Sequence, residues 1–245
     1  MKVLFLLPES PFPPDSGPRH HTYGLLQIAA QQHECHIAGF YRGKEGLAKW
    51  HQLKAAIPNV DIQGVFPETD GPRRLLQGVL SVASVEPLAV RGYASSEFST
   101  WLADFLLHNR YDLVHIDQFK LAHLWRHCGK VPTILVPYDA FSMAYRRAQA
   151  LSQSLVSKMI SYYLFRAFSR MEEQEYHHFT TVCPVSWVDA QWLKKRNPRI
   201  NTKVVGIAVA DDFFAQAAPG VSTSREPHVI CAGRFSGDCI AQGAI

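Results

Sequence analysis

The first loop of the chain, PESPFPPDSGPRHHTYG at residues 8–24, combines small, polar and basic residues in a way that suits a ligand. It separates the apolar run KVLFLL from a predicted helix that begins near Arg19, so Asp15, Ser16 and Gly17 lie at the positive end of that helix. Free backbone N–H groups at such an end can hold an anion or sugar hydroxyls. The alternative is a helix cap, with Asp15 or Ser16 capping and Pro18 at the first helical position. The candidate substrate-binding residues of this loop are Ser16, Gly17, Arg19 and His20.

Two further polar pairs end apolar runs later in the chain. Asp117-Gln118 follows the run YDLVHI, and Tyr138-Asp139 follows VPTILVP. Because the carboxyl ends of parallel strands meet at one edge of a sheet, we expect both pairs to lie beside the first loop. We also expect the carboxylates of Asp117 and Asp139 to emerge from the sheet, where either can bind sugar hydroxyls or act as a base. A predicted helix follows each pair, so helix capping is the alternative role.

Short apolar runs and amphipathic segments alternate along the whole chain. This alternation is typical of an α/β fold, Rossmann-like and doubly wound, with a mainly parallel sheet covered by helices on both faces. The predicted strands are residues 2–7, 33–41, 59–65, 111–117, 131–139, 180–186 and 202–209. The first predicted helix begins near residue 19. The others cover residues 44–57, 75–85, 95–109, about 119–128, about 142–178 and 188–196.

The composition changes towards the end of the chain. Residues 1–214 form the predicted Rossmann-like domain, and residues 215–227, AQAAPGVSTSREP, have the composition of a linker. Residues 228–245 then predict a strand, a Gly-Arg turn and the start of a helix. One strand and part of a helix cannot bury a core, so we expect this fragment to pack on the first domain, to find a partner or to stay loose.

Charge and composition exclude several classes of protein. The chain is 47% hydrophobic and 19% charged, which is typical of a globular protein, and its net charge is +4. A mildly basic protein can contact anionic lipid or phosphate, but without an arginine-rich tract with interleaved aromatics we expect no nucleic acid partner. The five cysteines form no CxxC pair, so reduced thiols in a cytoplasmic protein are expected. The first apolar run is too short for a signal peptide, and no run is long enough to span a bilayer.

Residues 142–178 are rich in aromatic and basic side chains. A helix of this composition can lie on an anionic membrane surface, which predicts a peripheral location at the inner face of the membrane. The alternative is a core helix whose basic residues face water. The sequence leaves both open.

The motifs of several common enzyme classes are missing. There is no GxGxxG after the first strand, no Walker A sequence and no GxSxG, so nicotinamide, ATPase and serine hydrolase chemistry are not expected. His123 and His127 stand one helical turn apart beside Cys128, but no carboxylate accompanies them and an ordinary helix is the favoured interpretation. We therefore predict no metal site and no cofactor.

The order of these features resembles the N-terminal half of family 4 glycosyltransferases, which have the GT-B fold of two Rossmann-like domains. The matching segments span nearly the whole chain: KVLFLLPESPFPPDSGPRHHTYGLL, YDLVHIDQ, VPYDAFS, TTVCPVSWVDAQWL, KVVGIAVADDFF and VICAGRFSG. The resemblance implies a nucleotide-sugar donor, an acceptor bound mainly by this domain, and metal-independent transfer. It also implies that the chain stops shortly after the start of the donor domain.

The resemblance assigns roles to individual residues, and the chain departs from the family at several of them. Arg234 matches the arginine that helps to neutralise the donor diphosphate. Gly17-Pro18 stands where the family has paired glycines, and Ile207-Ala208 replaces the usual Asn-Gly. Tyr138 occupies the place of a histidine close to the transferred sugar. By this comparison Tyr138 and Asp139 are the candidate catalytic residues, and Asp117 and Gln118 are candidate substrate-binding residues.

Two functions of different classes follow. The first is a glycosyltransferase that moves a sugar from a nucleotide sugar to a polysaccharide or lipid-linked acceptor, with this chain supplying mainly the acceptor-binding half. If the polypeptide ends at Ile245, we expect the chain alone to transfer little sugar. The second is a non-catalytic Rossmann-like module that binds a glycan or a partner protein, which the missing donor motifs and Tyr138 favour.

Overall fold

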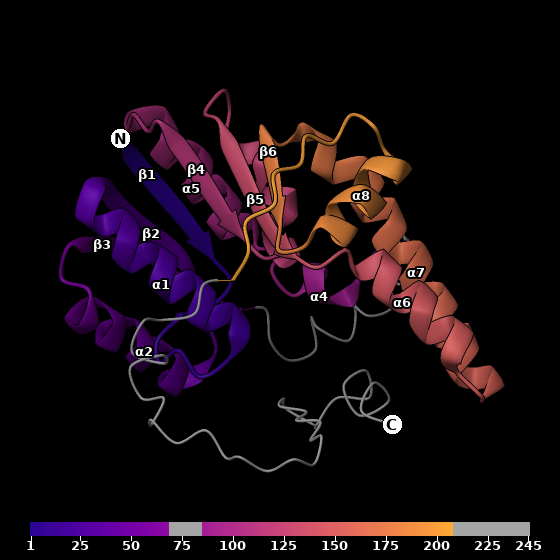
Figure 1. Ribbon diagram of the computed structural model, residues 1–245. Coiled ribbons are helices and arrows are strands. Elements are labelled where there is room, and N and C mark those ends of the chain that lie inside the picture. The colour runs from indigo at the N-terminus through magenta and orange to yellow at the C-terminus, as the bar shows by residue number, and fades with distance from the viewer. Residues whose placement is uncertain (69–84, 208–245) are drawn as a thin grey trace, which may run out of the picture. The chain divides into compact units, whose positions relative to one another are not determined.

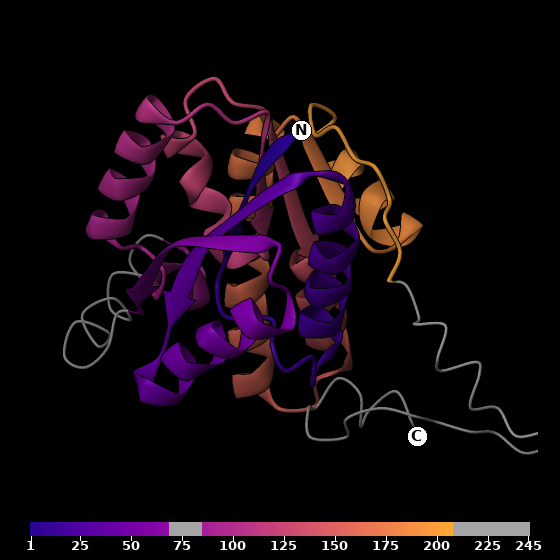
Figure 2. The same cartoon turned by 90° about the vertical axis from the view of Figure 1, so that its left-hand side faces the viewer.

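The computed structural model describes residues 1–68 and 85–207, and its compact unit runs from Met1 to Ile207. In this part of the chain six strands form one parallel sheet in the order β3-β2-β1-β4-β5-β6 (Figure 1). Helices cover both of its faces (Figure 2), so the predicted Rossmann-like fold class is confirmed. The strands are β1 (Lys2–Leu7), β2 (Glu34–Tyr41), β3 (Val60–Pro67), β4 (Leu113–Asp117), β5 (Thr133–Tyr138) and β6 (Thr181–Pro184).

Strand β1 is buried on both faces, and its side chains alternate between two apolar clusters. Val3, Phe5 and Leu7 pack with helices α1 (Gly17–Gln32) and α2 (Gly43–Ala56). Leu4 and Leu6 pack on the opposite face. This explains why the sequence shows a continuous apolar run there and not an alternating pattern. The elements that supply side chains to the opposite face include α5 (Ser96–His108), η1 (Phe119–His127), α6 (Phe141–Leu151), α7 (Leu155–Glu175), η2 (Tyr176–His178) and α8 (Trp187–Arg196).

The long helix predicted over residues 142–178 is wrong, because the chain forms two helices there. Helix α6 ends at Leu151 and α7 begins at Leu155. The Ser152 hydroxyl lies 2.7 Å from the Ala148 carbonyl oxygen. Serine side chains that bond to nearby backbone in this way compete with helix continuation. The two helices then run side by side as a hairpin (Figure 1).

Three further elements differ from the sequence prediction. Residues 119–127 form a 3-10 helix, whose three-residue turns place Phe119 and Ala122 on one buried side. The predicted strand 202–209 is wrong in its described part, where Thr202 makes only an isolated bridge to Val182. The short helix α4 (Leu88–Arg91) was not predicted. Residues 75–84 of a predicted helix, and the linker and fragment predicted over 215–245, lie outside the described residues.

Glu172 is a fully buried carboxyl group that joins α7 to the start of α6. Its Oε1 accepts the Ser142 backbone N–H at 3.0 Å, and its Oε2 contacts the Ser142 hydroxyl. That hydroxyl also accepts the Trp192 indole N–H at 2.7 Å. Burial raises the pKa of Glu172 to about 7, although the bonds from Ser142 oppose the rise. The folded protein therefore keeps this carboxyl group protonated up to a higher pH than the unfolded chain does.

We expect Glu172→Gln to become more stable relative to the wild type as the pH rises. Because the folded pKa lies above the unfolded one, this group binds more protons in the folded state, and its contribution to stability falls between about pH 4.5 and pH 7. The amide does not titrate, so the variant should gain roughly 2 kcal/mol over the wild type between pH 5 and pH 8. Urea unfolding at both pH values measures this. Glu97→Gln, at an exposed site on α5, is the matched control, and an equal gain there contradicts the assignment.

Candidate functional site

The polar residues at the ends of β4 and β5 meet the first turns of α1. The Thr22 hydroxyl lies 3.1 Å from Asp117 Oδ2 and 2.8 Å from the Tyr138 hydroxyl. The Tyr138 hydroxyl in turn lies 3.1 Å from Asp117 Oδ1 and 3.0 Å from the Pro18 carbonyl oxygen. The predicted meeting of the first loop with the ends of the fourth and fifth strands is therefore confirmed. We call Pro18, Thr22, Asp117 and Tyr138 the Asp117 cluster.

The Asp117 carboxylate does not emerge from the sheet, which corrects the expectation from the sequence. It is only 3% exposed, because Thr22 and Tyr138 close over it. Burial raises the pKa of Asp117 to about 7, against the opposing effect of its hydrogen bonds to Tyr138 and Thr22. Burial and the neighbouring Asp117 also raise the pKa of Tyr138. At neutral pH the cluster is thus poised between its neutral and its charged form.

Two residues at this edge of the sheet have a left-handed backbone conformation, which residues other than glycine rarely adopt. Gln118 has φ +66° and Tyr138 has φ +69°, both in the left-handed region. Such a residue costs about 1–3 kcal/mol and persists only where surrounding contacts hold it. Here the Gln118 N–H donates to the Val136 carbonyl at 2.9 Å, and the Tyr138 carbonyl accepts the Val185 N–H at 3.0 Å. Strained residues at the ends of two adjacent strands are typical of a functional site.

The other predicted residues lie around this cluster. Ser16 is the N-cap residue of α1 but its side chain makes no capping bond, and Gly17 is exposed. Arg19 pairs with Asp15 at 2.8 Å and with Glu9, and His20 is exposed. Pro18 is the second residue of α1, one position later than predicted, because the helix begins at Gly17.

Asp139 and Gln118 complete the set at the strand ends. Asp139 is exposed, as expected, and partial desolvation together with the Asp189 carboxylate raises its pKa. It is not a helix cap, because Ala140 holds the N-cap position of α6. Gln118 is buried beside Asp117. Arg234, predicted to bind the donor phosphate, lies outside the described residues.

Two buried histidines lie near the Asp117 cluster. The ring of His21 lies edge-on to the Tyr138 ring at 5.6 Å, and burial lowers its pKa. Burial also lowers the pKa of His115 to about 3, so both rings are neutral at physiological pH. Within residues 1–68 and 85–207 no group of three or more His, Cys, Asp or Glu side chains could hold a metal ion.

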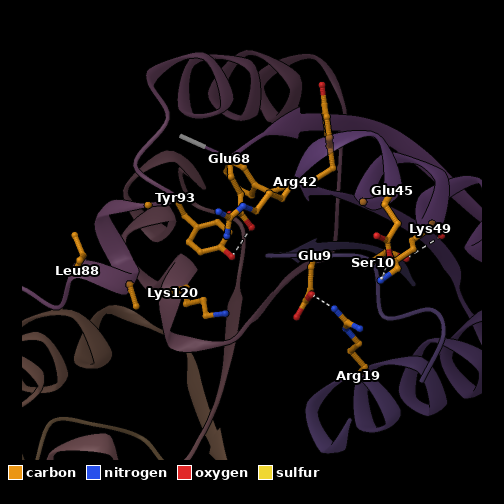
Figure 3. A pocket seen from close by; sticks show the side chains of 15 residues that line it. Glu9, Ser10, Arg19, Arg42, Glu45, Lys49, Glu68, Leu88, Tyr93 and Lys120 are labelled. Carbon is orange, nitrogen blue, oxygen red and sulfur yellow. Dashed lines mark hydrogen bonds and ion pairs between the residues drawn. The ribbon is translucent and has the colours of Figure 1, made fainter. Parts of the chain in front are cut away.

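A pocket of about 630 Å³ opens at the ends of β1, β2 and β3, beside α4 and η1 (Figure 3). Its charged walls are largely fixed by pairing. Lys49 pairs with Glu45 at 3.2 Å, and the Tyr93 hydroxyl donates to Glu68 at 2.8 Å. Lys120 lies over the Tyr93 ring at 5.5 Å. The charged residues that line the pocket are Glu9, Arg19, Arg42, Glu45, Lys49, Glu68 and Lys120.

Arg19 connects the pocket with the Asp117 cluster. It lines the pocket through its ion pair with Glu9, and it lies one turn before Thr22 on α1. Of the predicted site residues that the structure describes, Arg19 alone is among the pocket-lining set. The rest of the lining was missed, although Arg42 and Glu68 directly follow β2 and β3 just as Asp117 ends β4. Their position directly after parallel strands is the sequence signal that points to them.

Two solved structures share this fold. One is Phytolacca americana UGT2 complexed with UDP-2fluoro-glucose and pterostilbene, with a TM-score of 0.51 and 13% sequence identity over 87% of this chain and 56% of that chain. The other is an apo structure of OtsA, with a TM-score of 0.51 and 11% identity over 90% of this chain and 52% of that chain. Both are glycosyltransferases of the GT-B fold, and the present chain spans about half the length of each. No protein-family model matches the chain, and no curated protein matches it in sequence. The likeness establishes the fold.

Proposed function

We propose that the chain is part of a glycosyltransferase that moves a sugar from a nucleotide sugar to a polysaccharide or lipid-linked acceptor, and that it supplies mainly the acceptor-binding half. The observation that carries the proposal is the charged pocket at the carboxyl edge of the parallel sheet. It lies beside the point between β1 and β4 where the strand order reverses, which is where doubly wound sheets bind ligands. The fold shared with two glycosyltransferases supports the same conclusion.

The pocket walls suit a saccharide. Carboxylate and ammonium groups such as Glu68 and Lys120 bond to sugar hydroxyls, and the Tyr93 ring offers an apolar surface between them. Because Tyr93 already holds Glu68, the carboxylate does not have to be ordered when a ligand binds. In the proposal Ser16, Gly17, Arg19 and His20 contact the substrates at the start of α1.

The strand-end residues divide the remaining roles. Asp139 is exposed, and in the proposal it orients a sugar hydroxyl near the reacting centre. Asp117, Gln118 and Tyr138 are buried, and in the proposal Asp117 and Tyr138 fix the position of the start of α1 through Pro18 and Thr22. The donor diphosphate is proposed to lie near Gly17 and Arg234. The proposal includes no metal and no cofactor.

We expect the chain to bind a saccharide, and Glu68→Gln to weaken that binding about tenfold through loss of a charged acceptor. Ligand-observed NMR with maltose, cellobiose, glucuronic acid, UDP-glucose and GDP-mannose measures it. Glu97→Gln, at an exposed site on α5, is the control. Absence of binding by every probe, or equal affinity in Glu68→Gln, contradicts the proposed pocket.

The second candidate is a binding module without catalysis. It is favoured by one observation: the hydroxyl of Tyr138 and the carboxylate of Asp117 are turned towards each other and not towards solvent. A transfer assay with labelled UDP-glucose and GDP-mannose, given the saccharide that binds, separates the two. Labelled product supports the transferase, and binding without product supports the module.

A further inference from the structure

The hairpin of α6 and α7 ends in a group of exposed apolar side chains. The two helices run together away from the sheet in Figure 1, and residues 152–154 join them. Each of the large apolar side chains at this end is more than half exposed. Exposed apolar groups of this size are uncommon unless they meet a partner. We call this group the hairpin tip: Leu151, Leu155, Val156, Met159, Ile160 and Tyr162.

Most of the hairpin, from Phe141 to Met171, carries charge of one sign. Residues 141–171 contain five basic side chains and no aspartate or glutamate. The first acidic residue after this stretch is the buried Glu172, at the opposite end of α7 from the tip. Lys158 lies between two residues of the hairpin tip, Val156 and Met159, in the sequence. The basic residues are Arg146, Arg147, Lys158, Arg166 and Arg170.

A groove between α6 and α8 has the same combination of apolar and basic side chains as the hairpin tip and its surroundings. Its volume is about 490 Å³, and its apolar lining residues include Met143 and Trp192. Its charged lining residues are Arg146, Arg147 and Lys195, with no acidic residue among the lining. It also includes Ala150, which precedes the first residue of the tip. Apolar and cationic side chains therefore lie next to each other both at the hairpin tip and in the groove.

We propose that the hairpin tip docks on an anionic lipid surface, with its apolar side chains in the interfacial layer and the neighbouring arginine and lysine side chains against the headgroups. An apolar face flanked by basic residues is the pattern that binds such surfaces. A second copy of the chain is a poorer occupant, because a two-fold contact would bring two sets of cations together. No helix in the described part of the chain is long and apolar enough to cross a bilayer, so the contact is peripheral.

Co-sedimentation with lipid vesicles tests the proposal. We expect the chain to bind phosphatidylcholine vesicles that contain phosphatidylglycerol, and to bind pure phosphatidylcholine far less. The double variant Leu155→Ser/Met159→Ser should lose about tenfold in partition by removing apolar contact, and Arg147→Glu/Lys158→Glu should lose at least as much at low salt. Leu107→Ser is the matched control, since Leu107 is 80% exposed but lies on α5. Circular dichroism verifies that each variant is folded.

Three results overturn the proposal: no binding of the wild type to anionic vesicles, equal binding by the tip variants, or equal loss in Leu107→Ser. Sedimentation velocity gives a further check. A dimer that forms without lipid, and that the tip variants abolish, assigns the tip to a second copy and also overturns the proposal. The vesicles contain no glycan, so failure here leaves saccharide binding at the pocket unaffected.

Discussion

Replacing Asp117 with asparagine is expected to raise the free energy of unfolding at pH 8 and to raise it far less at pH 5. The carboxyl group is almost fully buried, and burial raises its pKa to about 7. Ionising it inside the protein therefore costs free energy that ionisation in the unfolded chain does not. An asparagine keeps one acceptor for Thr22 or Tyr138 and adds an amide donor, so the shape of the cluster can be retained.

The sign follows from proton counting. Between the unfolded pKa of Asp117, near 3.8, and the folded pKa, the folded chain holds the proton more often than the unfolded chain does. The stability contribution of this group is then greatest below about pH 4, falls as the pH rises and levels off above about pH 7. The total change is roughly 4 kcal/mol, of which roughly 2 to 3 kcal/mol falls between pH 5 and pH 8.

Urea unfolding of the wild type and of Asp117→Asn at several pH values measures the effect. The control is Asp104→Asn, because Asp104 is exposed on α5. A constant difference between wild type and Asp117→Asn across this range would show that the carboxyl group does not titrate in the folded state as proposed. A gain at pH 8 that Asp104→Asn reproduces would show a general effect of net charge.

The edge of the sheet at which the site lies could be predicted because it depends on local patterns. Short apolar runs ending in Asp117 and Tyr138 place those residues at the carboxyl ends of strands, and the alternation of elements makes the strands parallel. These apolar runs do not predict where α1 packs relative to the strand ends. The burial of Asp117 depends on Thr22 reaching across the strand ends, a contact between residues 95 positions apart.

The pocket shows a different limit. Asp117 and Asp139 are conspicuous at the ends of the fourth and fifth predicted strands, whereas the residues after the second and third strands are not. Arg42 and Glu68 follow the second and third strands and line the charged pocket. The hydrogen bond between Tyr93 and Glu68 and the approach of Lys120 depend on the segments around α4 and η1, and α4 is too short to give a periodic signal.

Helix type and length were the least predictable features. The composition of residues 142–178 favours helix throughout, so only the hydroxyl contact of Ser152 marks the break. The 3-10 helix comes directly after Gln118, whose left-handed backbone has no sequence signal because glutamine rarely adopts it. Residues 202–207 have the composition of a strand but form only an isolated bridge to β6, at Thr202, and one further backbone hydrogen bond from Val205 to Pro184.

Substituting Gly39 with alanine is expected to cost about 3 kcal/mol of stability, because the new methyl group has no space. Gly39 lies on β2 opposite Leu7 of β1. A Cβ at this position would overlap the Leu7 carbonyl oxygen and lie 2.9 Å from two carbons of the Trp50 ring. Neither neighbour can move easily, since Trp50 is 1% exposed and donates its indole N–H to the Phe40 carbonyl at 3.0 Å.

The same substitution at Gly24 should have the opposite sign. Gly24 lies within α1 with no atom within 4 Å of an added Cβ, and alanine favours a helix by up to about 1 kcal/mol over glycine. Urea unfolding of both variants measures the contrast. The two strands that Gly39 joins lead directly into the pocket through Glu9 and Arg42, so Gly39→Ala should also weaken saccharide binding while Gly24→Ala preserves it. Equal stabilities for the two variants would contradict the close approach of β1, β2 and Trp50 on which the shape of the pocket depends.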